Sequence, residues 1–284
     1  MGKKKDDTKS SGEKAYKFLL TEKLPNGVAI ATLNRPEENN VLHYPLFLEI
    51  TDLMETMSVD DDVRVVIFRA AGDHFCMGGD MRHIVKNQGI ETSRFFSGLE
   101  RMYMAIKHCR KITIAAVHGT CTAGGFGVSM SNDMVVASED AKFGTTAVKV
   151  GMYCATSGVM LPPIIGAKRA FMLGFTGELI SAAEAERWGF INKVVPREKL
   201  METAMQLAET MLAYSPLGLD VGKKAFLMTR DMEYGKALHF SIRQIAYLID
   251  TKDGKEAMKA FLEKRKPVWS DEWRKRGGDI SPSR

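Results

Sequence analysis

The sequence predicts an α/β protein whose last third is helical. Residues 63–68 (VRVVIF) and 112–117 (ITIAAV) are apolar enough to be strands buried on both faces, as strands of a parallel sheet are. Each run is followed by a loop rich in glycine and then by a stretch with helical spacing of apolar residues. This alternation of strands and helices is typical of an α/β core with a parallel sheet.

Further elements of this core can be assigned in chain order. Residues 16–33 contain two strand patterns joined at Pro25-Asn26-Gly27, a turn signal of the Asn-Gly kind. Residues 42–57 and 95–108 carry Leu, Ile, Met and aromatic residues at helical spacing, and residues 134–137 are a further strand. We therefore expect a hairpin followed by alternating helices and parallel strands.

After residue 180 the pattern becomes helical. Ser181 and Glu184 have the spacing of a capping box, and Trp188-Gly189 ends the helix that they begin. Amphipathic helices are then predicted over residues 199–214, 218–230, 235–250 and 254–265. The chain is thus expected to have three parts, which are a disordered polar tail at 1–14, an α/β core at 15–195 and a helical region at 196–284.

Composition excludes several classes of protein. The chain has 284 residues, of which 45% are hydrophobic, and its formal charge is only +5, with basic and acidic residues interleaved, so a nucleic-acid partner is not expected. No apolar run is long enough for a membrane helix, and residues 1–14 lack the apolar region of a signal peptide. The four cysteines form no CxxC pair and no histidines have metal-ligand spacing, so we expect no metal and a cytoplasmic location.

Two loops carry the strongest functional signal. Residues 75–81 (FCMGGDM) follow the first buried strand, and residues 118–127 (HGTCTAGGFG) follow the second. At such junctions backbone N–H groups point out of a helix N-terminus, where negative charge is favoured. Two such groups from neighbouring junctions can grip one oxygen, as in an oxyanion hole. Neither loop has the GxxxxGK[ST] or GxGxxG pattern of nucleotide-binding loops.

Four further motifs accompany these loops. They are LNRP with Asn40 at residues 33–40, AKFG at 141–144, a segment from TGELISA to WG at 176–189, and FLEKRKP at 261–267. In this order, the six motifs make residues 16–269 resemble the crotonase superfamily, the enoyl-CoA hydratases and isomerases. The resemblance implies a spiral of ββα repeats, a C-terminal helical trimerisation region, and assembly as a homotrimer or hexamer. It also implies an acyl-CoA thioester as substrate, so that coenzyme A is part of the substrate and no separate cofactor is expected.

The resemblance also assigns residues to the site. The oxyanion donors are expected to be the N–H groups of Met77 and Gly124. Glu37 stands where the family's first loop often has a lysine that contacts a phosphate. The segment along the coenzyme A path is expected at Cys76, Met77, Gly78, Gly79 and Asp80. Phe261 and Lys264 match positions that reach the coenzyme A of a neighbouring subunit in the family.

The chain departs from the family's hydratases at both catalytic glutamates. Gly127 occupies the first glutamate position and Ala147 the second, within an FGxPE pattern that reads FGTTA here. Water addition to a conjugated double bond needs both a base and an acid, and these residues supply neither. Tyr153 is then the catalytic candidate, against the alternative of a packed tyrosine, and Cys154 is interpreted as an inert pocket lining.

Two histidines near the loops are interpreted as structural. His83 is expected to be an exposed helix residue, and His118 is expected to bond a loop carbonyl. We therefore predict an enzyme that binds an acyl-CoA and stabilises a thioester enolate, with isomerisation, decarboxylation, C–C cleavage and thioester hydrolysis left open. The alternative is a non-catalytic or regulatory homologue that binds CoA thioesters. An RNA-binding function, as in some relatives, is disfavoured by the dispersed charge.

Overall fold

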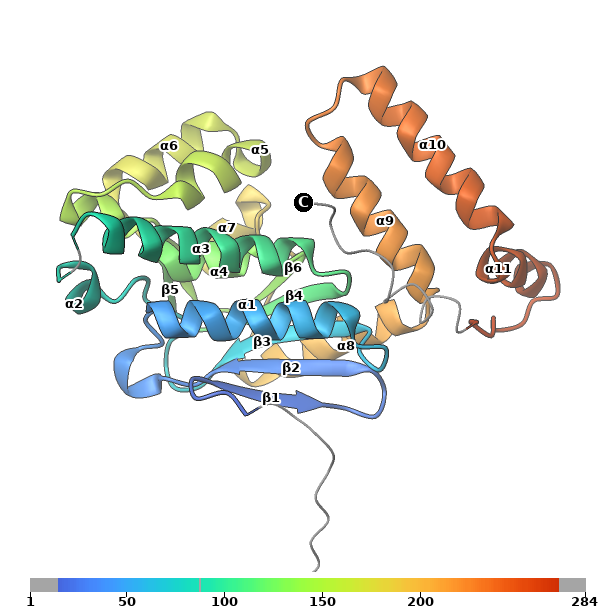
Figure 1. Ribbon diagram of the computed structural model, residues 1–284, viewed down its shortest axis with the longest axis horizontal. Coiled ribbons are helices and arrows are strands. Elements are labelled where there is room, and N and C mark those ends of the chain that lie inside the picture. Colours follow the sequence, from blue (N-terminus) through green and yellow to red (C-terminus); the bar gives the residue numbers. More distant parts are fainter. Residues whose placement is uncertain (1–14, 87, 271–284) are drawn as a thin grey trace, which may run out of the picture.

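The computed structural model describes residues 15–86 and 88–270, so the predicted tail at residues 1–14 lies outside the described residues. Six strands form the main sheet in the order β1-β2-β3-β4-β6-β9, with β1 antiparallel to β2 and the other neighbours parallel (Figure 1). They are β1 (Leu19–Lys23), β2 (Val28–Leu33), β3 (Val65–Ala70), β4 (Ile112–Val117), β6 (Met134–Ser138) and β9 (Lys193–Val195). The predicted α/β core with a parallel sheet is confirmed.

A second, smaller sheet lies beside the main one. It has the order β5-β7-β8, formed by β5 (Thr120–Thr122), β7 (Lys142–Gly144) and β8 (Ile180–Ser181). Successive strands alternate between the two sheets, since β4 and β6 belong to the main sheet while β5 and β7 belong to the small one. With α4 (Ala123–Ser131) after β5, this gives ββα units of the expected kind.

Local sequence signals explain the boundaries of several elements. The hairpin of β1 and β2 turns at Gly27, whose φ of 92° favours glycine. The hydroxyl of Ser181 accepts a hydrogen bond from the N–H of Glu184 and begins α7 (Ala182–Trp188), which ends at Gly189 in the left-handed region. The Glu184 carboxylate pairs with Arg187 rather than completing the predicted capping box.

Helices cover both faces of the main sheet. On one face, α1 (Tyr44–Val59) and α3 (Ile90–His108) pack against the larger apolar core. On the other face, α8 (Leu200–Leu212) packs through Leu200, Ala204 and Ala208 against β3, β4 and β6. Thus α8, which lies within the predicted C-terminal helical region, packs as part of the α/β core, and it is the helices after it that stand apart.

Three helices extend from the core beyond α8, namely α9 (Pro216–Thr229), α10 (Tyr234–Asp250) and α11 (Lys252–Leu262), as Figure 1 shows. Two ion pairs tie α9 to the core, Lys223 to Asp133 at 2.6 Å and Arg110 to Asp220 at 2.7 Å. Within the described part of the chain, α10 has no buried residue. No helix among the described residues is both long and apolar enough to span a bilayer.

The remaining short elements lie in the connections. They are η1 (Pro36–Glu38), α2 (Met81–Ile84), η2 (Thr146–Val150), η3 (Thr156–Met160), α5 (Pro162–Ile165), α6 (Ala167–Thr176) and η4 (Arg197–Lys199).

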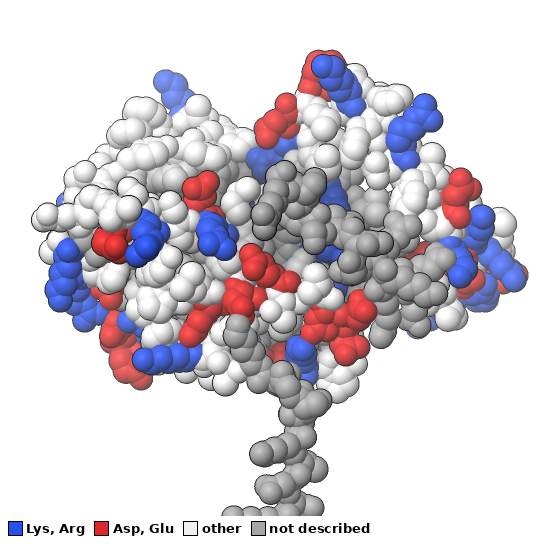
Figure 2. Space-filling model, in the orientation of Figure 1, with Lys and Arg blue, Asp and Glu red and all other residues white. Residues whose placement is uncertain are grey.

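Acidic and basic side chains are interspersed over the face drawn in Figure 2, as the interleaved sequence suggests.

Candidate functional site

An apolar cavity of about 370 Å³ lies where the loops after β3 and β4 meet. This is the carboxyl end of two parallel strands, where ligands of α/β proteins commonly bind. The two loops lie side by side because the N–H of Cys76 donates to Thr120 and the N–H of Thr122 donates back to Cys76. The cavity is lined by Leu42, Phe47, Met77, Gly79, Met81, Ile84, Phe95, Phe96, Leu99, Tyr103, Ala123, Gly124, Thr146, Ala147, Val150, Met152, Tyr153, Cys154, Ala155 and Thr156.

The first loop is fixed by a short parallel bridge to Leu42. The N–H of Leu42 donates to the Gly78 carbonyl at 2.7 Å, and the Leu42 carbonyl accepts from Asp80 at 2.8 Å. The N–H of Met77 donates to the Asn39 carbonyl at 3.2 Å. Met77 therefore lines the cavity, but its N–H already has a hydrogen-bond partner. This differs from the prediction, in which the Met77 N–H is free to act as an oxyanion donor.

Two other backbone N–H groups belong to neighbouring residues of the cavity lining. The structure gives the N–H of Gly79 and that of Gly124 no hydrogen-bond partner among the residues it describes. A β-carbon added to Gly124 would lie 3.7 Å from the Gly79 nitrogen, and one added to Gly78 would lie 3.7 Å from the Gly124 nitrogen. Gly78 has φ of 102°, a conformation that favours glycine and lets the two loops approach closely.

A tyrosine that sequence reasoning missed completes this part of the site. Tyr103, on α3, lines the cavity, and its hydroxyl donates to the Gly124 carbonyl at 2.9 Å. Burial raises the pKa of the phenol well above its usual value, an effect that the hydroxyl of Thr156 opposes. In the sequence, Tyr103 sits at an apolar position of a helix and reads as a core aromatic, so no local signal distinguishes it.

The two positions at which the resemblance places the glutamates of hydratases, Gly127 and Ala147, have different surroundings. A β-carbon at position 127 would lie 2.3 Å from the Tyr103 hydroxyl oxygen, so the phenol fills the space beside Gly127. Ala147 lines the cavity wall. Among the described residues that line the cavity, none carries a carboxylate, an imidazole or an amine, and the polar side-chain groups are the hydroxyls of Tyr103, Thr146, Tyr153 and Thr156 and the Cys154 thiol.

Tyr153 lies at the mouth of the cavity and is 64% exposed. Its hydroxyl lies over the backbone of Gly158, so close that a β-carbon there would be 1.2 Å away. Cys154 is buried in the lining, and its carbonyl accepts a hydrogen bond from the Ser157 hydroxyl at 2.9 Å. Tyr153 thus lines the cavity, while its hydroxyl is directed along η3 rather than toward Gly79 and Gly124.

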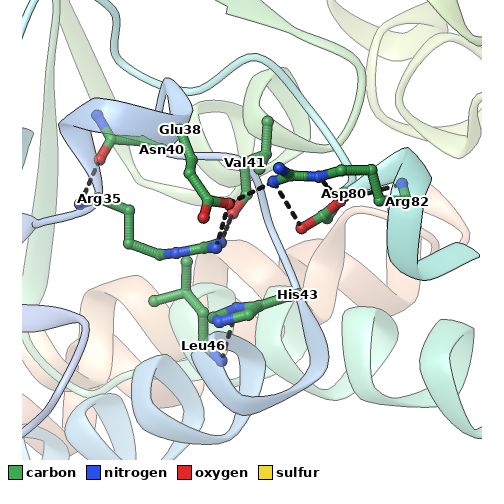
Figure 3. Close-up of polar contacts among 8 residues, drawn as sticks. All are labelled: Arg35, Glu38, Asn40, Val41, His43, Leu46, Asp80 and Arg82. Atoms are coloured by element: carbon green, nitrogen blue, oxygen red, sulfur yellow. Dashed lines mark hydrogen bonds and ion pairs between the residues drawn. The ribbon is translucent and has the colours of Figure 1, made fainter.

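A polar network holds the first loop against the segment before it (Figure 3). Glu38 lies between two guanidinium groups, 2.6 Å from Arg35 and 2.5 Å from Arg82. Asp80 caps α2 by accepting from the Arg82 N–H and pairs with its side chain. Burial would raise the pKa of Asp80, but the hydrogen bond and charge of Arg82 outweigh it and lower the pKa. The Asp80 side chain therefore has a structural part in this loop.

Two further side chains in Figure 3 anchor the same segment. The buried Asn40 amide donates to the carbonyls of Ala71 and His74, both at 2.9 Å. His43 caps α1, because its Nδ1 accepts from the Leu46 N–H at 3.3 Å. Burial, with a contribution from the Arg35 charge, lowers the pKa of His43 to about 4, so the ring stays neutral and keeps this acceptor.

Other predicted site residues lie outside the cavity lining. Cys76 is fully buried beneath the loop, where burial raises the pKa of its thiol to about 12, and it packs against Gly125. Phe261, on α11, is 83% exposed, and Lys264 follows α11 with φ of 54°. Figure 1 places α11 far from α2, α3 and α4, so one chain does not bring Phe261 and Lys264 to its own cavity.

The two histidines near the loops differ in how they agree with the prediction, since His118 contacts a loop carbonyl as expected and His83 is not exposed. The Nε2 of His118 is 2.9 Å from the Gly72 carbonyl oxygen, and burial lowers the pKa of its ring. His83 is half-buried rather than exposed, because its ring lies 5.6 Å from that of Phe95.

Comparison with known proteins identifies the family to which the chain is similar. The family model described as enoyl-CoA hydratase/isomerase matches residues 23–272. The human protein named enoyl-CoA hydratase domain-containing protein 3, mitochondrial, is 32% identical over 248 residues, which are 87% of this chain and 82% of the relative. The (E)-benzylidenesuccinyl-CoA hydratase of Thauera aromatica is 33% identical over 252 residues, covering 88% of this chain and 98% of the relative.

Solved structures show the same fold. The enoyl-CoA hydratase of Mycobacterium smegmatis has a TM-score of 0.87 at 30% identity, covering 89% of this chain and 99% of that one. Human enoyl-CoA hydratase domain-containing protein 3 has a TM-score of 0.86 at 31% identity, covering 89% and 100%. The crotonase-like fold expected from six motifs is thereby confirmed, and the chain belongs to the enoyl-CoA hydratase/isomerase family.

Proposed function

We propose that the protein binds an acyl-CoA thioester and holds its carbonyl oxygen between the N–H groups of Gly79 and Gly124. The observation that carries this proposal is that both groups lack a partner in the described structure and belong to neighbouring residues that line the same apolar cavity. Donors fixed in advance in a dry site stabilise negative charge on an oxygen strongly. Gly79 replaces Met77 as the first donor, since the Met77 N–H is bonded to Asn39.

The cavity supports an apolar acyl group beyond the thioester. Its walls include Phe47, Phe95, Phe96 and Leu99, and no charged residue among those described lines it. A volume of about 370 Å³ falls in the range of small-molecule sites. Each buried methylene contributes about 0.8 kcal/mol, so an uncharged acyl chain of several carbons is expected to bind better than a dicarboxylic one.

The reaction we propose passes through a thioester enolate, whose negative oxygen the two N–H groups stabilise. Ordinary hydration is not proposed, because Gly127 and Ala147 stand where two carboxylates would act. The lack of a carboxylate, an imidazole or an amine in the described lining also favours a second candidate, a homologue that binds CoA thioesters without turnover. Turnover assays with a panel of acyl-CoA thioesters separate the two, since chemical change of any thioester at a rate above the buffer reaction establishes an enzyme.

The oxyanion assignment is tested with acetoacetyl-CoA, whose enolate absorbs in the ultraviolet. Gly79→Pro and Gly124→Pro each remove one N–H donor. Loss of one donor in other enzymes costs about 10²–10³-fold, so the affinity for the enolate is expected to fall by a comparable factor. Gly79→Ala and Gly124→Ala are the matched controls because they keep the N–H. The β-carbon at position 79 would meet the end of Ile84 at 3.0 Å, and the one at position 124 would meet the end of Leu42 at 3.0 Å, with the Tyr103 oxygen and the Gly79 nitrogen at ordinary contact distances of 3.6 and 3.7 Å.

Two outcomes decide this test. Weak enolate binding by both proline variants, with strong binding by the alanine variants, supports the two-donor site. Folded proline variants that bind the enolate like the parent protein would show that other groups hold the oxygen.

A homotrimer or hexamer is part of the proposal. It is supported by the apolar side chains that α10 exposes, Ile242, Ile245 and Ile249, each about half accessible in the single chain. In such an assembly Phe261 and Lys264 are proposed to reach the coenzyme A of a neighbour. A cytoplasmic location remains a prediction, and the human relative is named as mitochondrial.

A further inference from the structure

Tyr103 connects three features of the cavity that are separate in sequence. Its hydroxyl donates to the Gly124 carbonyl at 2.9 Å, lies 3.6 Å from where a β-carbon of Gly124 would be, and fills the space beside Gly127. The same β-carbon position is 3.7 Å from the Gly79 nitrogen. The Tyr103 hydroxyl and the Gly79 nitrogen therefore both lie close to the same point beside Gly124.

We propose that Tyr103 is a positioning residue that orients Gly124 toward the thioester oxygen and replaces, with a neutral hydroxyl, the side chain that position 127 lacks. This inference rests on the proposed function, because it assigns a task within the same oxyanion site. Tyr103 acts through Gly124 and takes no proton from the substrate.

The backbone around Gly124 needs such an anchor. Gly124 and Gly125 are consecutive glycines at the start of α4, and glycine has the largest conformational freedom of any residue. Ala123, just before them, has φ of 47°, a strained conformation for a residue with a β-carbon. The hydrogen bond from Tyr103 to the Gly124 carbonyl restricts backbone rotation at Gly124. Such rotation would move the first turn of α4 away from the cavity.

The chemistry of the phenol suits this task. Because burial raises its pKa well above the usual value, the hydroxyl keeps its proton over the ordinary pH range and remains a donor to Gly124. A carboxylate in the same place would add a negative charge beside the enolate oxygen, whereas the phenol adds none. The site thus stabilises an enolate with neutral groups alone.

Tyr103→Phe tests the proposal in the full chain, with acetoacetyl-CoA as the probe. The variant keeps the ring and removes only the hydroxyl. One lost hydrogen bond is expected to weaken enolate binding by about three- to tenfold. The pKa of bound acetoacetyl-CoA, followed by enolate absorbance against pH, should rise accordingly. Affinity for butyryl-CoA, which does not ionise, should change less than twofold.

Tyr44→Phe is the matched control, because Tyr44 is a half-buried tyrosine of α1 that packs beside Phe47 without lining the cavity. A second readout needs no ligand: amide hydrogen exchange at Gly124 and Gly125 should be faster in Tyr103→Phe than in the parent. If Tyr103→Phe does not fold, 3-fluorotyrosine at position 103 is the second variant, because it keeps the hydroxyl and makes it a stronger donor. The pKa of bound acetoacetyl-CoA should then fall.

The outcomes separate the inference from the function on which it rests. If the parent protein does not bind acetoacetyl-CoA as an enolate, the oxyanion site itself is refuted. If the parent does so and Tyr103→Phe shows the same bound pKa and the same exchange rates, the oxyanion site stands and the role of Tyr103 is overturned. An equal loss of enolate and butyryl-CoA affinity would also overturn it, because that result indicates general disruption of the cavity.

Discussion

Adding one methyl group at Gly127 is expected to destabilise the protein through Tyr103. The β-carbon of Gly127→Ala would lie 2.3 Å from the Tyr103 oxygen and 2.4 Å from its Cζ, whereas unstrained contacts between such atoms are about 3.5–4.0 Å. The ring must therefore move by about 1 Å or more. Overpacking of this kind costs about 1–3 kcal/mol, and losing the hydrogen bond to Gly124 adds about 1 kcal/mol.

One effect opposes this loss, since alanine is more favourable than glycine in a helix by about 0.5–1 kcal/mol. We therefore expect Gly127→Ala to lower the free energy of unfolding by about 1–3 kcal/mol, measured by urea denaturation. Tyr103→Ala alone should cost about 3–5 kcal/mol, as for other buried aromatic residues.

A double variant tests whether Tyr103 causes the cost of Gly127→Ala. With Tyr103 replaced by alanine, the space beside position 127 is open, so Gly127→Ala should then cost nothing or stabilise the helix. The interaction energy of the cycle is expected to be about 1–3 kcal/mol. An equal cost of Gly127→Ala in both backgrounds would show that Tyr103 is not what excludes a side chain there.

Three other predictions concern catalysis, assembly and pH. Hydration of crotonyl-CoA should be slower than in efficient hydratases by at least about 10²–10⁴-fold, since Gly127 and Ala147 are not titratable, and a typical hydratase rate would contradict this. Light scattering at micromolar concentration should show a trimer or hexamer, and a monomer alone would refute the assembly. The folded-state pKa of His43 is about 4, below its usual 6.5, so its contribution to stability is full above pH 6.5 and is lost as the pH falls toward 4. His43→Asn keeps a capping side chain without this titration, so its unfolding free energy should fall less steeply over that range than the parent's.

Much of the fold was predictable because long periodic segments carry their own signal. Residues 112–117 form β4 as predicted, and the helix predicted over 235–250 is α10, which begins one residue earlier. The strands β5 and β8 were not predicted, since two or three residues show no period. The packing of α8 on the sheet was also missed, because an amphipathic helix does not reveal which apolar surface it will cover.

The candidate site was predictable in its position but not in its details. The two glycine-containing loops could be found because each follows a buried strand. The choice between Met77 and Gly79 depends on a parallel bridge to Leu42 and a hydrogen bond to Asn39, which join segments about 40 residues apart. No local pattern contains that information.

The packing around positions 127 and 147 adds to what the resemblance implies for these two positions. Gly127 on its own reads as a lost acid, but with Tyr103 against it the same position is one that no larger side chain can occupy without movement of the ring. Ala147 lines a cavity in which the described residues carry no carboxylate, imidazole or amine. The polar side-chain groups of this lining are hydroxyls and one thiol. In the proposed function, the negative charge of a bound enolate is stabilised by backbone N–H groups, so the protein's effect on the enolate is expected to depend on how firmly Gly79 and Gly124 are held.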